Sequence, residues 1–207
     1  MTASRSPPGF LPVEGSGIVC RQMGPPGCGG RQAHACRANS ATIGLRPLKT
    51  LPIMTVEQRL KDLGIELPTG TAPAANYANA VRSGNLLFLS GKAPLAEGGT
   101  LPKGRIGREF SADDGYRFAR SATLDLIAVM KAELGSLDRV ARIVDLQGFI
   151  NATEEFEDHA KVLNGASDLL VEVFGERGVH ARSVLGAVSL RAGLPIVLRA
   201  VVEVVPG

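Results

Sequence analysis

The chain has 207 residues, of which 44% are hydrophobic, 21% charged and only 4% aromatic, so its core has to be aliphatic. The net charge of +3 arises before Met54, where six basic residues accompany one acid; the remainder holds 17 basic and 19 acidic residues. We therefore expect no nucleic-acid partner. We also expect no membrane partner, because no apolar run reaches the ~18 residues of a spanning helix.

Residues 1–53 are predicted to form a disordered leader, or an over-extended start, before a folded domain at residues 54–207. Stretches such as SPPGF and GPPGCGG are rich in Pro and Gly, and no secretory apolar core is present. All the cysteines lie in this leader. Because Cys28, His34 and Cys36 lack the spacing of a zinc site, no metal is expected. A cysteine-free domain fits a reducing compartment such as the cytoplasm.

The folded region starts with two short elements. TVEQRLKDLG predicts a helix with Thr55 as N-cap, Gln58 at the capping-box position and Gly64 as its stop. ANAVRSGNLLFLSG is typical of a β-hairpin that turns at Ser83-Gly84-Asn85. A glycine-rich loop is expected over residues 94–108.

The clearest helix begins after Ser111, with Asp113 and Asp114 in its first turn and Gly135 as its stop. One face of this helix is apolar and is expected to pack on a sheet: Ala119, Ala122, Leu126, Val129 and Met130.

A strand from Arg139 to Ile150 and a second helix from about Glu154 to Phe174 are predicted next. The inward residues of this helix are expected to be Phe156, Leu163, Leu170 and Phe174. Two last strands, at about 182–190 and 195–205, are joined by the turn Arg191-Ala192-Gly193.

The resulting order, β-β-α-β-α-β-β, predicts an α+β sandwich with two helices on one face of a mixed sheet. The strands are apolar at nearly every residue, as in LLFLS and IVLRAVVEVV. A half-exposed strand would alternate, so we expect an oligomer that covers the open face.

The segments NYANAV, FLSGKAP, VLN and ARS, in this order, resemble the RidA family (reactive intermediate deaminase A, or YjgF-like proteins) over roughly residues 70–205. The resemblance implies a chorismate-mutase-like fold and a barrel-like homotrimer with clefts between subunits. It implies hydrolysis of 2-iminobutanoate and 2-iminopropanoate to 2-oxo acids and ammonia. Because no Gly-rich phosphate loop, nucleophile elbow or metal-ligand cluster occurs after Met54, we expect no cofactor.

The resemblance assigns ligand-binding roles to four residues. Arg182 in HARS matches the arginine that holds the substrate carboxylate; its alternative is a surface or interface ion pair. Tyr77 matches a cleft tyrosine, and its alternative is interface packing. Ser90 matches the serine of the usual SGQ, with Lys92 in place of glutamine. Asn164 approximates the cleft asparagine, with helix capping or simple exposure as its alternatives.

One departure from the family pattern bears on catalysis. Val197 stands where the family has the glutamate that positions water, and Arg199 replaces the next acid. Valine cannot orient water or accept its proton. His180 is a weak candidate for that catalytic role, with simple exposure as its alternative, and Asp145 is a further candidate.

Three functions follow from the resemblance and this departure. The first is an imine deaminase on a modified site. The second is a non-catalytic protein that binds small carboxylates as a sensor or pathway accessory. The third is an endoribonuclease, the family's older label, which the near-neutral domain does not favour.

Overall fold

The computed structural model describes residues 54–73 and 75–206. The leader predicted for residues 1–53 lies outside the described residues. In chain order the helices and strands are α1 Val56–Asp62, β1 Ala80–Ser83, β2 Leu86–Leu89, α2 Ala112–Leu134, η1 Leu137–Arg139, β3 Val140–Asn151, α3 His159–Phe174, η2 Gly175–Gly178, β4 Ala181–Ala187, η3 Arg191–Gly193 and β5 Ile196–Val204. No helix among them is long and apolar enough to cross a membrane.

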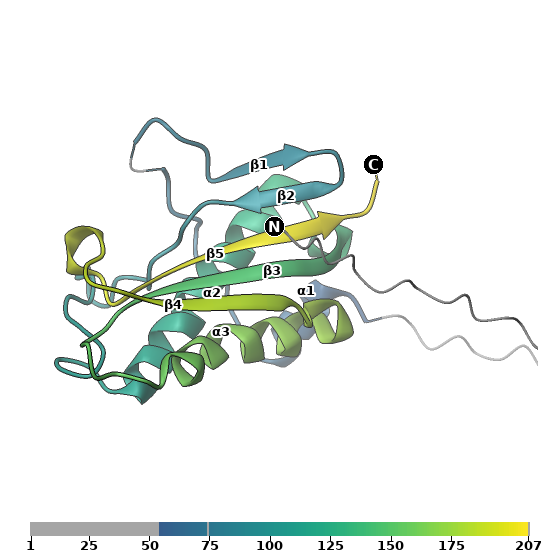
Figure 1. Cartoon of the computed structure of the whole chain (residues 1–207). Helices are drawn as coiled ribbons and strands as arrows, with labels where there is room; N and C mark the ends of the chain where they lie inside the picture. Colours follow the sequence, from purple (N-terminus) through teal and green to yellow (C-terminus); the bar gives the residue numbers. More distant parts are fainter. Residues whose placement is uncertain (1–53, 74, 207) are drawn as a thin grey trace, which may run out of the picture. The chain divides into compact units, whose positions relative to one another are not determined.

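The five strands form one mixed sheet in the order β1-β2-β5-β3-β4. Neighbouring strands are antiparallel except β3 and β4, which run parallel because α3 connects them. Strand β4 therefore ends the sheet on one side and the β1–β2 hairpin ends it on the other, as Figure 1 shows.

Helices α2 and α3 lie side by side on one face of the sheet (Figure 1). The predicted inward residues of α2 are all buried, as are Leu163, Leu170 and Phe174 of α3. They pack against the alternate residues of β5 that face the helices: Ile196, Leu198, Ala200, Val202 and Val204. The predicted α+β layering is confirmed.

Local signals set the ends of the first two helices as predicted. The Thr55 side chain accepts a hydrogen bond from the Gln58 N–H, and Gly64 follows α1 with a φ of 66°. Ser111 and Asp114 form a reciprocal capping box at the start of α2, and Gly135 ends it with a φ of 77°. In the hairpin, Ser83 pairs with Leu86, so the turn itself is Gly84-Asn85.

Two predicted boundaries were wrong. Helix α3 begins at His159, five residues after the predicted Glu154, and its N-cap Asp158 makes no side-chain cap hydrogen bond. Phe156 has the apolar spacing of the helix but packs against the core from the preceding turn. Strand β4 ends at Ala187 rather than 190, because its pairing with β3 ends at Asn151.

The face of the sheet away from the helices carries rows of paired side chains. One row is apolar and joins Leu185, Phe149 and Val197 across β4, β3 and β5. A second apolar row includes Val201, Phe88 and Val81 across β5, β2 and β1. Leu185, Phe88 and Val81 are 51%, 38% and 58% exposed. Within the described chain these two apolar rows are thus uncovered, and the polar row of Ser183, Gln147 and Arg199 lies between them.

The crossing of α2 and α3 depends on Gly165. A Cβ at this position would lie 2.0 Å from the Tyr116 carbonyl oxygen on α2. We expect Gly165→Ala to lower the free energy of unfolding by at least about 1–3 kcal/mol, because the two helices would have to separate. Urea unfolding at fixed protein concentration measures the loss.

Gly70→Ala is the matched control, since its Cβ would meet only Val129 Cγ2 at 3.8 Å. Equal unfolding midpoints for Gly165→Ala and the parent chain would contradict this close helix contact.

Candidate functional site

Arg182 projects from the edge strand β4 toward α3. Its neighbour across the strands is the buried Leu146, which places the Arg182 side chain on the helix-covered side of the sheet. Its Nη1 donates to Asn164 Oδ1 at 2.8 Å and to Ser167 Oγ at 3.1 Å. None of the ion pairs in the described part of the chain includes Arg182. An exposed guanidinium with neutral partners is suited to an anionic ligand.

His180 extends this cluster through Ser167. Its Nδ1 lies 2.5 Å from the Gly178 carbonyl oxygen, which accepts only, so Nδ1 carries the proton in the neutral ring. Its Nε2 then accepts from the Ser167 hydroxyl at 3.1 Å, and the same oxygen accepts from Arg182. Because both ring nitrogens are engaged, this geometry favours positioning of Arg182 over orientation of a water molecule.

Tyr77 and Ser90 lie together beside the β1–β2 hairpin. The Ser90 hydroxyl donates to the Ala78 carbonyl oxygen at 2.6 Å, and its N–H donates to the Asn79 carbonyl oxygen at 2.9 Å. Tyr77 is 47% exposed. The structure thus brings together Tyr77 with Ser90, and Arg182 with Asn164, but places the two pairs at opposite edges of the sheet.

A buried ion pair, missed in the sequence, holds the segment that carries Tyr77. Lys92 and Asp125 are 5% and 2% exposed, and Lys92 Nζ lies 3.6 Å from Asp125 Oδ2. Lys92 also donates to the Thr71 hydroxyl and the Asn79 side-chain oxygen, both at 2.9 Å, and to the Thr71 carbonyl oxygen at 3.2 Å. The Thr71 hydroxyl donates to Asp125 at 2.6 Å.

A cavity of about 370 Å³ opens beside this ion pair. Its lining includes Tyr77, Gly91, Lys92, Asp125 and Arg191. Arg191 comes from the turn between β4 and β5, so three distant parts of the chain meet at this cavity. The sequence predicted the turn but gave no signal that its arginine would lie near Tyr77.

Val197 lies next to the same region. A Cβ on Gly91 would come within 2.9 Å of Val197 Cγ1, and the cross-strand neighbours of Val197 are Phe149 and, one strand further, Leu185. Asp145 pairs with Val201, four residues along β5 and about 13 Å away. At the position for which the resemblance implies an acid, the cross-strand neighbours are therefore apolar.

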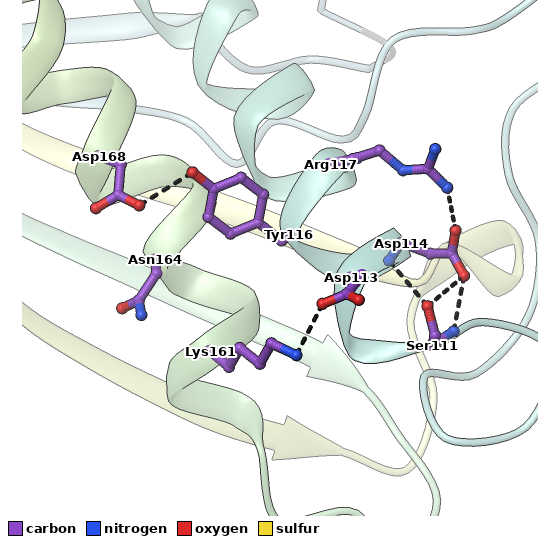
Figure 2. Close-up of a pocket in the computed structure, with 8 residues that line it drawn as sticks. All are labelled: Ser111, Asp113, Asp114, Tyr116, Arg117, Lys161, Asn164 and Asp168. Carbon is purple, nitrogen blue, oxygen red and sulfur yellow. Dashed lines mark hydrogen bonds and ion pairs between the residues drawn. The ribbon is translucent and has the colours of Figure 1, made fainter.

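A second cavity, of about 730 Å³, lies elsewhere, between the start of α2 and α3. Figure 2 shows its charged groups joined in pairs: Lys161 with Asp113, and Arg117 with Asp114. The Ser111 hydroxyl and N–H, followed by Arg117, lower the pKa of Asp114 to about 2. Since these charges are satisfied within the chain, this cavity is a weaker candidate for an ionic ligand.

Tyr116 and Asn164 also line the large cavity. Tyr116 donates to Asp168 at 3.0 Å, and burial followed by this hydrogen bond raises the pKa of Tyr116. Asn164 has no such contact with the other residues drawn in Figure 2; its side-chain oxygen accepts from Arg182 instead.

The fold and these clusters define a small α+β protein with a mixed sheet, one helix-covered face and an arginine on its edge strand. The chain belongs to the family described as "YjgF/chorismate_mutase-like, putative endoribonuclease", whose model matches residues 57–197. The resemblance to RidA and YjgF-like proteins, and the chorismate-mutase-like fold that it implied, are confirmed.

Three similar proteins are informative. Protein TCP17 of Trypanosoma cruzi is 41% identical over 149 residues, which cover 72% of this chain and 93% of that protein. The crystal structure of Atu1372 from Agrobacterium tumefaciens, a protein of unknown function, matches with 37% sequence identity and a TM-score of 0.67. The match covers 72% of this chain and 92% of that one. A "putative endoribonuclease" from Shewanella oneidensis is 35% identical with a TM-score of 0.70 over 72% and 99%.

The Lys92–Asp125 pair yields a stability prediction. We expect Lys92→Met to lower the free energy of unfolding by about 3–5 kcal/mol, because it leaves the Asp125 carboxylate buried without its cation. The double variant Lys92→Met with Asp125→Leu should recover part of that loss. Chemical denaturation of all three proteins measures the difference; a single variant as stable as the parent would refute a buried ionic link.

Proposed function

We propose that the protein binds small 2-oxo and 2-imino carboxylic acids in clefts formed between copies of the chain. The observation that carries this proposal is the division of the site residues into two groups at opposite edges of one sheet. A cleft that contains both groups needs the β4 edge of one copy and the β1–β2 side of the next.

The exposed surfaces support such an assembly. Strand β4 is an edge strand whose residues are all exposed or half-buried, and Arg182 is its one charged side chain. An exposed edge strand can pair with another chain, and proteins usually cover or block such an edge. One apolar row on the open face, that of Val197, Phe149 and Leu185, continues up to this edge. A contact between unlike edges is heterologous, and it forms a closed ring when the rotation between copies closes. The family resemblance implies a closed ring of three copies.

The charge at Arg182 supports a carboxylate ligand. Asn164 and Ser167 fix one nitrogen of the guanidinium while contributing no charge. A planar carboxylate can then meet the fork with two parallel hydrogen bonds. Tyr77 and Ser90 of the adjacent copy would line the other side of the cleft.

The surroundings of Val197 favour binding over efficient imine hydrolysis. Water that attacks a protonated imine needs an acceptor to orient it and take its proton. Phe149, Gly91 and Leu185 near Val197 supply none. The function therefore proposed is that of a sensor or accessory protein, and turnover of 2-iminopropanoate is the alternative outcome.

The first test removes the carboxylate partner. We expect Arg182→Ala to weaken the binding of pyruvate roughly 10- to 150-fold, because one charge-assisted contact contributes about 1.5–3 kcal/mol. Titration calorimetry gives the affinity, and Arg108→Ala is the control because Arg108 is exposed and its one ion pair among the described residues is with its neighbour Glu109.

Sedimentation of the same samples tests the assembly. The parent chain should sediment as a closed oligomer, and as a trimer if the family resemblance holds. A monomer at the concentration at which pyruvate binds, or unchanged affinity in Arg182→Ala, would overturn the proposal.

The second test restores the missing acid. We expect the parent chain to hydrolyse freshly generated 2-iminopropanoate no faster than buffer, and Val197→Glu to raise the rate by about 10²-fold or more, since a positioned base contributes about that factor. Semicarbazone trapping follows the imine. Rapid hydrolysis by the parent chain would instead make this protein a deaminase with a different proton acceptor.

A further inference from the structure

The cavity beside Tyr77 carries an excess of positive charge. Lys92 and Asp125 both line it, and their charges cancel each other. The three donors of Lys92 are matched by three acceptors, the Thr71 carbonyl oxygen, the Thr71 hydroxyl and the Asn79 side chain. Lys92 is therefore occupied by the chain itself, and the charge that remains is Arg191.

Arg191 belongs to no ion pair among the described residues. Its side chain is exposed and lines the cavity together with Tyr77. The volume of about 370 Å³ lies within the roughly 300–1,000 Å³ of small-molecule sites. An unpaired guanidinium in such a site favours an anion.

The turn that presents Arg191 is held in place. Ala192 has a φ of 54°, the left-handed region that costs a residue other than glycine about 1 kcal/mol or more. Three contacts retain this conformation: Leu194 N–H donates to the Arg191 carbonyl oxygen at 3.1 Å, Gly104 N–H donates to that of Gly193 at 2.9 Å, and the buried Asn151 donates to that of Leu194 at 3.3 Å.

We propose that Arg191 binds a second carboxylate of the ligand, so that the site prefers 2-oxo and 2-imino dicarboxylic acids to monocarboxylic ones. This inference rests on the proposed function, in which Arg182 of the neighbouring copy holds the first carboxylate. The ligand then spans from one guanidinium to the other across the cleft. Tyr77 lines the cavity between the hairpin and this turn, where the middle of the ligand would lie.

The test compares two probes that differ by one carboxylate, 2-oxoglutarate and 2-oxobutanoate. Titration calorimetry on the assembled protein should show about 10-fold tighter binding of 2-oxoglutarate. This factor corresponds to the low end of the free energy that a hydrogen bond to a charged group contributes, because Arg191 is exposed. Arg191→Ala should remove this preference and change 2-oxobutanoate binding by less than about 2-fold. Arg108→Ala, an exposed arginine elsewhere, should leave both affinities unchanged.

The remaining outcomes are decisive. A parent chain without preference for 2-oxoglutarate, or a preference that survives in Arg191→Ala, overturns the inference. If Arg191→Ala fails to assemble, Arg191→Gln keeps the side-chain length and is judged by the same ratio of affinities. Arg182→Ala should weaken the binding of both probes, and the proposed function fails if it weakens the binding of neither. Arg191→Ala tests the further inference separately, because it should remove only the preference for 2-oxoglutarate.

Discussion

The structure depends on how two helices cover one face of a five-stranded sheet. Helices α2 and α3 approach closely because Gly165 leaves room for the Tyr116 carbonyl, and together they bury the aliphatic face of β5 and β3. The chain has no further long helix among its described residues for the opposite face. What remains uncovered within the described chain is a sheet face with two apolar rows and an edge strand, and the proposed assembly relies on these surfaces.

The sequence was informative where structure is decided by neighbouring residues. The Ser111 capping box and the Gly84-Asn85 turn are local, so their spacing predicts them. The start of α3 was not predictable in the same way, because Phe156 has a helical spacing yet packs on the core from the preceding turn. Periodicity records which side chains are buried, and a turn can bury a side chain as well as a helix does.

The residues of the candidate site show the same difference between local and long-range signals. Arg182 and Asn164 are 18 residues apart, and the resemblance to a family placed both in one site. The Lys92–Asp125 link joins a residue after β2 to the middle of α2, and no local pattern connects them. The role of His180 was equally hidden, because its partner Ser167 lies on α3 and has no distinguishing motif.

The buried charges of this chain stabilise the fold, whereas its exposed arginines can bind a ligand. Lys92 is enclosed with its counter-ion and with acceptors for each of its protons, so removal of its charge affects folding. Arg182 and Arg191 are exposed, and their partners within the described chain carry no charge. Their positive charges can therefore interact with an anion. The resemblance implies a water-positioning acid at the position of Val197, which lies within an apolar row. Under the proposed function, the two guanidinium groups would hold an anion across the cleft, and Val197 could not act as a proton acceptor beside it, so the charges serve binding rather than proton transfer.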